Sequence, residues 1–174
     1  LLSSQHRLAP SIERIAARNG GTGQFGNGIN VFRANGVLVS DNHVSDCAFS
    51  AIRANSSSNL RITGNAALRS GETALYAEFA FDGAVISANI VDGAANGISV
   101  VNFNEGGRMA TVSGNIVRNL SSKGPYMADP PGFGVGITVE ADSAVTGNMV
   151  ENAPLHGIAI GWGAFMRNVV ATGN

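Results

Sequence analysis

One short unit recurs along the chain and limits its possible folds more than any other feature. Each unit ends in a small residue followed by asparagine, and successive asparagines are separated by 23, 24, 26, 33 and 26 residues. A period of this length is typical of a solenoid, in which each repeat forms one coil that stacks on its neighbours. The recurring asparagines are Asn42, Asn65, Asn89, Asn115, Asn148 and Asn174.

Short apolar strands fill each unit. One strand starts with Gly-Ile or a similar pair, a second precedes the asparagine, and a third follows most of the asparagines. Apolar residues alternate in the first strand, so that Ile29 and Val31 are predicted to face the core and Asn30 to face outward. Three short strands per unit predict an all-β, right-handed parallel β-helix, because the leucine pattern of a helix-containing solenoid is absent. The first strands start at Gly28, Ala51, Ala74, Gly97, Gly136 and Gly157.

The asparagines are predicted to form a ladder inside the turns. Asparagine tolerates the left-handed backbone conformation of a tight turn, and its amide both donates and accepts hydrogen bonds. We therefore interpret these asparagines as scaffold rather than as a binding site. The same interpretation applies to the glycines that precede four of them, Gly64, Gly114, Gly147 and Gly173.

Composition agrees with buried strands and frequent turns, and it excludes several classes of protein. The chain has 23 glycines, 44% hydrophobic residues, 13% charged residues and a net charge of −1. Without a basic patch we expect no nucleic-acid partner, and without a long apolar run we expect no membrane insertion. The single cysteine, Cys47, excludes an internal disulfide framework and is expected to be a core thiol.

The chain is predicted to form one domain, 1–174, of about six coils. Residues 1–27 match the unit poorly and are interpreted as a degenerate coil and a loop, with a short helix over 11–18 as the alternative. The unit between Asn115 and Asn148 swells to 33 residues, which predicts a loop insertion at 121–133. Insertions in repeat arrays often lie on the binding face. Because both ends break the repeat, we expect a β-helix cut at both ends.

A further set of segments, spread over roughly residues 19–174, has a distinctive sequence: 20–34, 47–53, 76–81, 102–108, 139–142 and 161–163. These segments resemble the twin-arginine-translocated uncharacterised repeat proteins. The resemblance implies a pectate-lyase-like β-helix from a bacterium, exported to the periplasm or beyond, whose signal would lie upstream. It implies no defined reaction.

In pectate-lyase-like β-helices the substrate groove runs along the sheet that corresponds to the Gly-Ile strands, and the 121–133 insertion would form its wall. Reading outward positions from the alternation places charged, amide and aromatic side chains on this face, a mixture suited to sugars. Glu78, Glu140 and Arg53 are the catalytic candidates. The candidate substrate-binding residues are Tyr76, Asn30, Asn102, Glu105, Asp142, Trp162 and Tyr126.

Glu78 and Glu140 occupy equivalent places two coils apart, which predicts Cα atoms roughly 9–10 Å apart. Inverting glycosidases hold two carboxyls about 6.5–9.5 Å apart, so the pair is compatible with hydrolysis. A lyase would instead need a base such as Arg53 or a tyrosine. The acids could also be a solvated face or form local ion pairs. The sequence contains no calcium-loop spacing and no histidine cluster, so no cofactor is expected, with Ca²⁺ as the one alternative.

We therefore expect an exported protein that binds, and in one reading hydrolyses, eliminates or epimerises, a polysaccharide or oligosaccharide along the Gly-Ile strands. The alternative is a non-catalytic glycan-binding or structural solenoid. The sequence leaves open which glycan is bound, whether the protein is an enzyme, and its oligomeric state.

Overall fold

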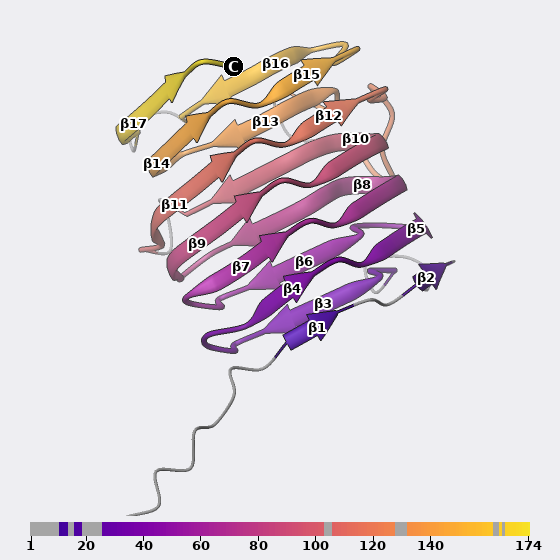
Figure 1. The fold of residues 1–174 in the computed structure, drawn as a ribbon. Coiled ribbons are helices and arrows are strands. Elements are labelled where there is room, and N and C mark those ends of the chain that lie inside the picture. The colour runs from indigo at the N-terminus through magenta and orange to yellow at the C-terminus, as the bar shows by residue number, and fades with distance from the viewer. Residues whose placement is uncertain are drawn as a thin grey trace, which may run out of the picture.

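A computed structural model describes residues 11–13, 16–18, 26–102, 106–127, 132–161, 164 and 166–174. Every regular element within these ranges is a strand, and the strands stack as successive coils along one axis (Figure 1). All strand pairs with a described register are parallel. This arrangement confirms the predicted all-β solenoid. No helix in the described part of the chain is long and apolar enough to cross a membrane.

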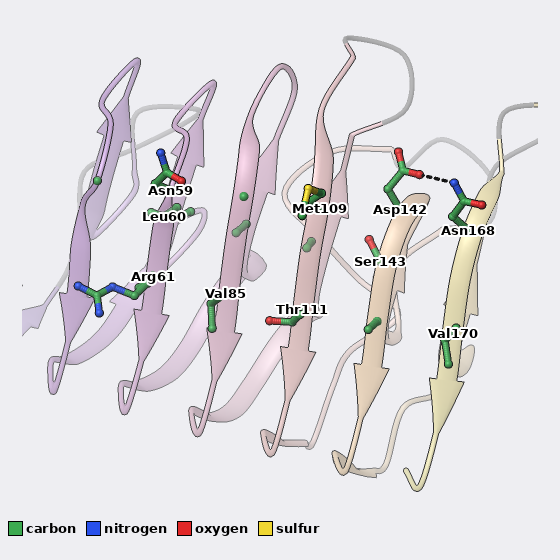
Figure 2. A pocket seen from close by; sticks show the side chains of 15 residues that line it. Asn59, Leu60, Arg61, Val85, Met109, Thr111, Asp142, Ser143, Asn168 and Val170 are labelled. Carbon is green, nitrogen blue, oxygen red and sulfur yellow. Dashed lines mark hydrogen bonds between the residues drawn. The ribbon is translucent and has the colours of Figure 1, made fainter.

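One side of the solenoid is a seven-stranded sheet made of the strands that precede the asparagine turns. Its outward face carries a groove (Figure 2). In spatial order its strands are β1 (Ser11–Glu13), β4 (Leu38–Ser40), β7 (Leu60–Thr63), β9 (Asp82–Ser87), β11 (Arg108–Ser113), β14 (Ala141–Thr146) and β17 (Arg167–Thr172).

The other two sides of each coil are joined into a ten-stranded sheet. The strands that follow the asparagines are β2 (Ala16–Arg18), β5 (His43–Cys47), β12 (Ile116–Arg118), β15 (Met149–Glu151) and the first halves of β8 (Ala66–Glu78) and β10 (Ile90–Val101). The second halves of β8 and β10 form the Gly-Ile sheet with β3 (Ile29–Phe32), β6 (Ile52–Asn55), β13 (Val135–Val139) and β16 (His156–Ile160). In β8 and β10 the strand that follows the asparagine therefore runs without a break into the next Gly-Ile strand.

The core is a stack of aliphatic side chains, one set from each coil. Ile29 and Val31 are 6% and 4% exposed while Asn30 is exposed, which confirms the predicted alternation. Ile29, Ile52 and Leu75 pair in register across β3, β6 and β8, and the same column continues to Ile98 and Ile137. Burial of one branched side chain contributes about 1.5–3 kcal/mol, so this column is a main source of stability.

Glycine starts several of these strands because neighbouring coils approach too closely there for a side chain. A Cβ placed on Gly97 would lie 2.3 Å from the carbonyl oxygen of Gly136, and one on Gly136 would lie 2.4 Å from that of Gly157. These separations are well below van der Waals contact. The glycines that start strands are scaffold, as predicted.

The asparagine ladder is present and continuous from Asn42 to Asn174. Each rung has the same geometry: the backbone N–H and Nδ2 of Asn65 both donate to Oδ1 of Asn89, at 2.9 and 3.0 Å. The left-handed conformation, however, belongs to the residue before each asparagine, such as Gly64 with φ of 69°. The expectation that asparagine itself adopts it is wrong, because the ladder needs each asparagine side chain turned inward against the next rung.

Two irregular regions flank this regular stack. Strands β1 and β2 pair with β4 and β5, so 11–13 and 16–18 extend the two sheets by one rung rather than forming a helix. The insertion at 121–133 lies between β12 and β13, and residues 128–131 of it lie outside the described residues, as do 1–10 and 19–25.

Candidate functional site

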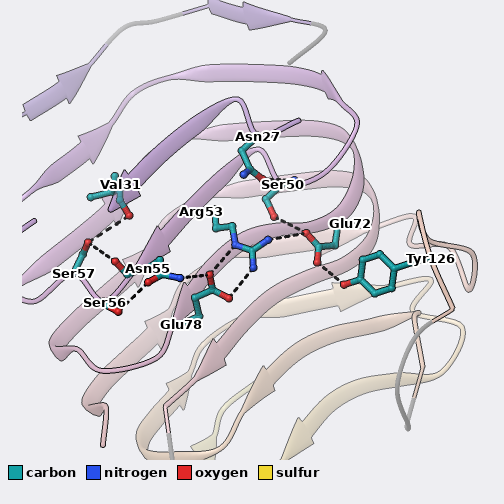
Figure 3. A network of polar contacts seen from close by, with 10 residues as sticks. All are labelled: Asn27, Val31, Ser50, Arg53, Asn55, Ser56, Ser57, Glu72, Glu78 and Tyr126. Atoms are coloured by element: carbon teal, nitrogen blue, oxygen red, sulfur yellow. Dashed lines mark hydrogen bonds and ion pairs between the residues drawn. The ribbon is translucent and has the colours of Figure 1, made fainter. Parts of the chain in front are cut away.

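Arg53 is the centre of a polar cluster on the outer face of the Gly-Ile sheet (Figure 3). It lies on β6, and its Nε and Nη2 atoms donate to the two carboxylate oxygens of Glu78 at 2.8 and 2.9 Å. Its Nη1 atom lies 3.5 Å from a carboxylate oxygen of Glu72. Glu78 also accepts a hydrogen bond from Nδ2 of Asn55 at 2.9 Å. One guanidinium therefore serves two carboxylates that are only 2% and 3% exposed.

Glu72 ties the loop insertion to this cluster. Its Oε1 atom accepts a hydrogen bond of 2.5 Å from the hydroxyl of Tyr126, which lies 54 residues further along the chain. Its Oε2 atom accepts from the hydroxyl of Ser50 at 3.3 Å. The Tyr126 ring also lies 6.0 Å from the ring of Phe49 and 5.4 Å from that of Phe133. The insertion is thus held beside the Gly-Ile sheet by the charged hydrogen bond to Glu72 and the ring contact with Phe49, while the contact with Phe133 lies within the insertion.

Tyr76 is the aromatic member of the cluster. The Arg53 guanidinium carbon lies 5.0 Å from the centre of its ring, within the range of a cation–π contact. Burial, together with the negative charges of Glu78 and Glu72, raises the pKa of Tyr76 above its usual value of about 10. Tyr76 therefore keeps its proton at neutral pH and is not a ready base.

Arg53 is equally unsuited to act as a base. Burial lowers its pKa, but the hydrogen bond and charge of Glu78 raise it by more, so the pKa of Arg53 lies above its usual range. A guanidinium held between carboxylates remains charged. The lyase reading with Arg53 as base gains no support from this geometry.

Glu78 and Glu140 directly follow Ala77 and Val139, which lie in one register column through Val100, so the two acids come at equivalent places two coils apart. Both side chains are nevertheless buried, with 2% and 8% exposure. Glu78 is bound by Arg53, and a carboxylate oxygen of Glu140 accepts the backbone N–H of Asn102 at 2.9 Å. The expectation of two solvent-facing carboxyls is therefore wrong, because neighbouring polar groups close over both. Their catalytic role stays a prediction without a geometric basis.

Asn102 and Asp142 lie away from the predicted surface. Asn102 is fully buried, and its amide bonds both the N–H and the carbonyl of Ala141, so it fixes a corner of the coil. Asp142 lies on β14 in the seven-stranded sheet and binds Arg167 and Asn168. The chain turns between Val139 and Ala141, which ends β13 and carries Asp142 off the Gly-Ile sheet.

The remaining predicted residues divide into two groups. Asn30 is exposed on β3, in register with Arg53 and then Tyr76, and Tyr126 reaches the cluster from the insertion. These four are brought together on one face. Glu105 and Trp162 lie outside the described residues.

Glu72 was not predicted from the sequence. It lies between the strand that follows Asn65 and the strand start at Ala74, so the alternation read along the predicted strands did not cover it. The feature that singles out Glu72 is its position: it is an acid within the thirteen-residue strand β8. Within the described ranges no three His, Cys, Asp or Glu side chains lie close enough together to hold a metal ion.

A comparison with protein families decides the classification. Residues 26–174 match a family model described as a right handed beta helix region. The chain belongs to the right-handed beta helix family. This match and the stacked parallel coils together confirm the predicted fold class. No curated protein and no solved structure matches the chain. The function of this beta helix protein must therefore be argued from its site rather than from a relative.

Proposed function

We propose that this beta helix protein binds a polysaccharide along the Gly-Ile sheet and does not cleave it. In this proposal the protein is bacterial and exported, as its resemblance to the twin-arginine-translocated repeat proteins implies. The bound chain runs along the solenoid axis, across the equivalent places in successive strands that are held by Asn30, Arg53, Tyr76, Ser99 and Thr138.

The contact between Tyr126 and Glu72 is the observation that carries the proposal. It fixes the insertion of the longest repeat beside the strip that contains Arg53 and Tyr76. A sugar-binding strip needs hydrogen-bonding groups for hydroxyls and aromatic surface for the C–H face of the ring. The amide of Asn30, the guanidinium edge of Arg53 and the two tyrosines offer both, next to a loop that forms one wall.

The protonation and pairing of the cluster favour binding over chemistry. Hydrolysis needs one protonated and one ionised carboxyl facing the glycosidic bond, with room for water in an inverting enzyme. Glu78 and Glu72 instead face Arg53, and Glu140 faces a backbone N–H. Tyr76 and Arg53 both hold their protons, so neither is set to remove one from a uronate ring.

The charge of the cluster favours a neutral glycan. Arg53 contributes +1, while Glu72 and Glu78 contribute −2, so these three side chains carry −1 together. A uronate polymer would place its own negative charges beside this excess of carboxylate. Neutral hydroxyls can accept hydrogen bonds from the guanidinium edge of Arg53 without adding charge beside the acids.

Binding of the whole chain to an array of neutral and uronate glycans tests this function. Thr138→Trp fills the strip and is expected to weaken glycan binding at least tenfold, while Thr111→Trp, on the seven-stranded sheet, leaves it unchanged. Neutral glycans are expected to bind without release of reducing ends or unsaturated uronate. Equal binding by both variants would overturn the location, and turnover of any bound glycan would favour the enzymatic alternative.

A further inference from the structure

The groove on the outer face of the seven-stranded sheet is elongated and lies away from the Arg53 cluster (Figure 2). It has a volume of about 840 Å³. Its floor takes one outward residue from each of five successive strands, in direct register: Arg61, Val85, Thr111, Ala144 and Val170. Its rim includes Asn59, Met109, Asp142 and Asn168. This axial groove therefore follows the solenoid in a straight line.

The axial groove is mainly apolar although it faces solvent. Val85, Met109 and Val170 are 39%, 59% and 58% exposed. Apolar side chains that gather on one exposed surface often mark a binding site. Among the residues that the structure describes, no aromatic side chain lines this groove, so these residues offer no stacking surface for a sugar ring.

One positive charge stands at an end of the axial groove. Arg61 is exposed, and it forms no ion pair with any residue that the structure describes. The acid on the rim, Asp142, is already bound by Arg167 at 2.7 Å and by Asn168 at 2.9 Å. The groove thus offers a cation at one end and an apolar floor beyond it, which complements an anionic head followed by an apolar tail.

The length of the floor sets the length of that tail. Arg61 and Val170 are four coil steps apart, and coils stack about 4.8 Å apart, which gives roughly 19 Å. A saturated chain advances about 1.25 Å per bond, from a bond length of ~1.5 Å and a near-tetrahedral angle. A chain of roughly 14–16 carbons therefore spans the floor.

We propose that the axial groove binds a single-chain fatty acid, with its carboxylate at Arg61 and its acyl chain over Val85, Met109, Thr111 and Val170. This site is independent of glycan binding on the Gly-Ile sheet. A second copy of the protein fits the groove less well, because stable interfaces bury about 800 Å² per partner with 20–30 residues a side. Only 15 residues line this groove, and three of them supply its large exposed apolar side chains.

Titration calorimetry with sodium myristate below its critical micelle concentration tests the site. Arg61→Gln is expected to weaken binding about tenfold, while Lys123→Gln, which removes a surface cation on the insertion, leaves it unchanged. In the series octanoate, decanoate, laurate and myristate, affinity is expected to rise about twofold for each methylene, as for partly buried groups.

Met109→Asp supplies a second test that preserves the backbone. Met109 has φ of 61°, and the residue in register with it in the next coil, Asp142, already adopts φ of 47° as an aspartate. The new carboxylate would face the acyl chain and is expected to abolish myristate binding without lowering the thermal midpoint. Three results would overturn the proposal: no myristate binding, affinity indifferent to Arg61→Gln and chain length, or a dimer in sedimentation that Met109→Asp dissociates.

Discussion

Arg53 and Glu78 form a two-point ion pair between adjacent coils, through hydrogen bonds of 2.8 and 2.9 Å. They are not directly opposite each other: Arg53 is in register with Tyr76, and Glu78 with Asn55. The guanidinium must therefore cross the face of the Tyr76 ring to reach the carboxylate. The ring and the acid together fix the orientation of Arg53, which also reaches Glu72.

Removing Arg53 should cost much more stability than removing an exposed arginine. Arg53→Met leaves the Glu78 carboxylate, which is 2% exposed, without a cation, and should lower the free energy of unfolding by about 3 kcal/mol. Arg69→Met breaks an exposed pair with Asp46, which solvent screens, and should cost much less. Urea unfolding of both variants measures the difference; equal losses would mean that the buried pair adds nothing special.

Stability should fall in alkaline solution because of Tyr76. Its pKa is raised in the folded protein, so above about pH 10 the unfolded chain releases this proton while the folded protein still holds it. The free energy of unfolding should then decrease by up to about 1.4 kcal/mol per pH unit from this group. Thermal midpoints at pH 8–11 should fall less steeply for Tyr76→Phe than for the unchanged protein. If the thermal midpoints of both proteins fall equally with pH, Tyr76 is not the group responsible.

A buried rung of the asparagine ladder should be far more sensitive than an exposed asparagine pair on the surface. Asn89→Ala removes the acceptor of two donors on Asn65 and the donor to the carbonyl of Ile62, all buried. Each buried group left without a partner costs about 1–3 kcal/mol, so three such groups give an expected loss of at least about 3 kcal/mol. Asn35→Ala removes the acceptor of one exposed hydrogen bond, from Nδ2 of Asn59, and should cost at most about 1 kcal/mol. Similar denaturation midpoints for the two variants would show that the ladder is not a main source of stability.

Two equivalent glycines provide a matched pair. A Cβ on Gly136 would meet the Gly157 carbonyl at 2.4 Å and Val150 at 2.5 Å, whereas one on Gly157 would meet no described residue within 4 Å. Gly136→Ala should therefore destabilise by about 1–3 kcal/mol, and Gly157→Ala should be neutral. Chemical denaturation of both variants tests whether close stacking of coils is the reason for glycine at the strand starts.

The hydroxyl of Tyr126 should control how firmly the insertion is held. Tyr126→Phe keeps the ring contacts with Phe49 and Phe133 but removes the hydrogen bond to Glu72. Limited trypsin digestion after Lys123 should become several-fold faster, while cleavage after Arg118, on β12, should not change. Unchanged cleavage after Lys123 would show that ring packing alone holds the insertion.

The fold could be predicted because its rules are local and repeated. The alternation of Ile29 and Val31 predicts one strand, and the spacing of the ladder asparagines predicts the turns. The same strand and turn then recur in each stacked coil. The site could be predicted only in part. Asn30, Arg53 and Tyr76 follow the alternation. Asp142 was placed on the same face as if β13 continued past Val139, whereas the chain turns there into β14. The contact of Tyr126 with Glu72 depends on the path of an insertion, which no period describes.

The hydrogen bonds of the ladder have nearly the same lengths whatever the number of residues between successive asparagines. Asn115 and Asn148 are 33 residues apart, yet their bonds of 3.0 and 2.9 Å match those of Asn42 and Asn65, which are 23 apart. By loop-closure entropy the ten additional residues cost only about 0.3 kcal/mol. This scaffold can therefore accept foreign segments of similar length between β12 and β13, which makes that connection a natural place for grafting new recognition loops.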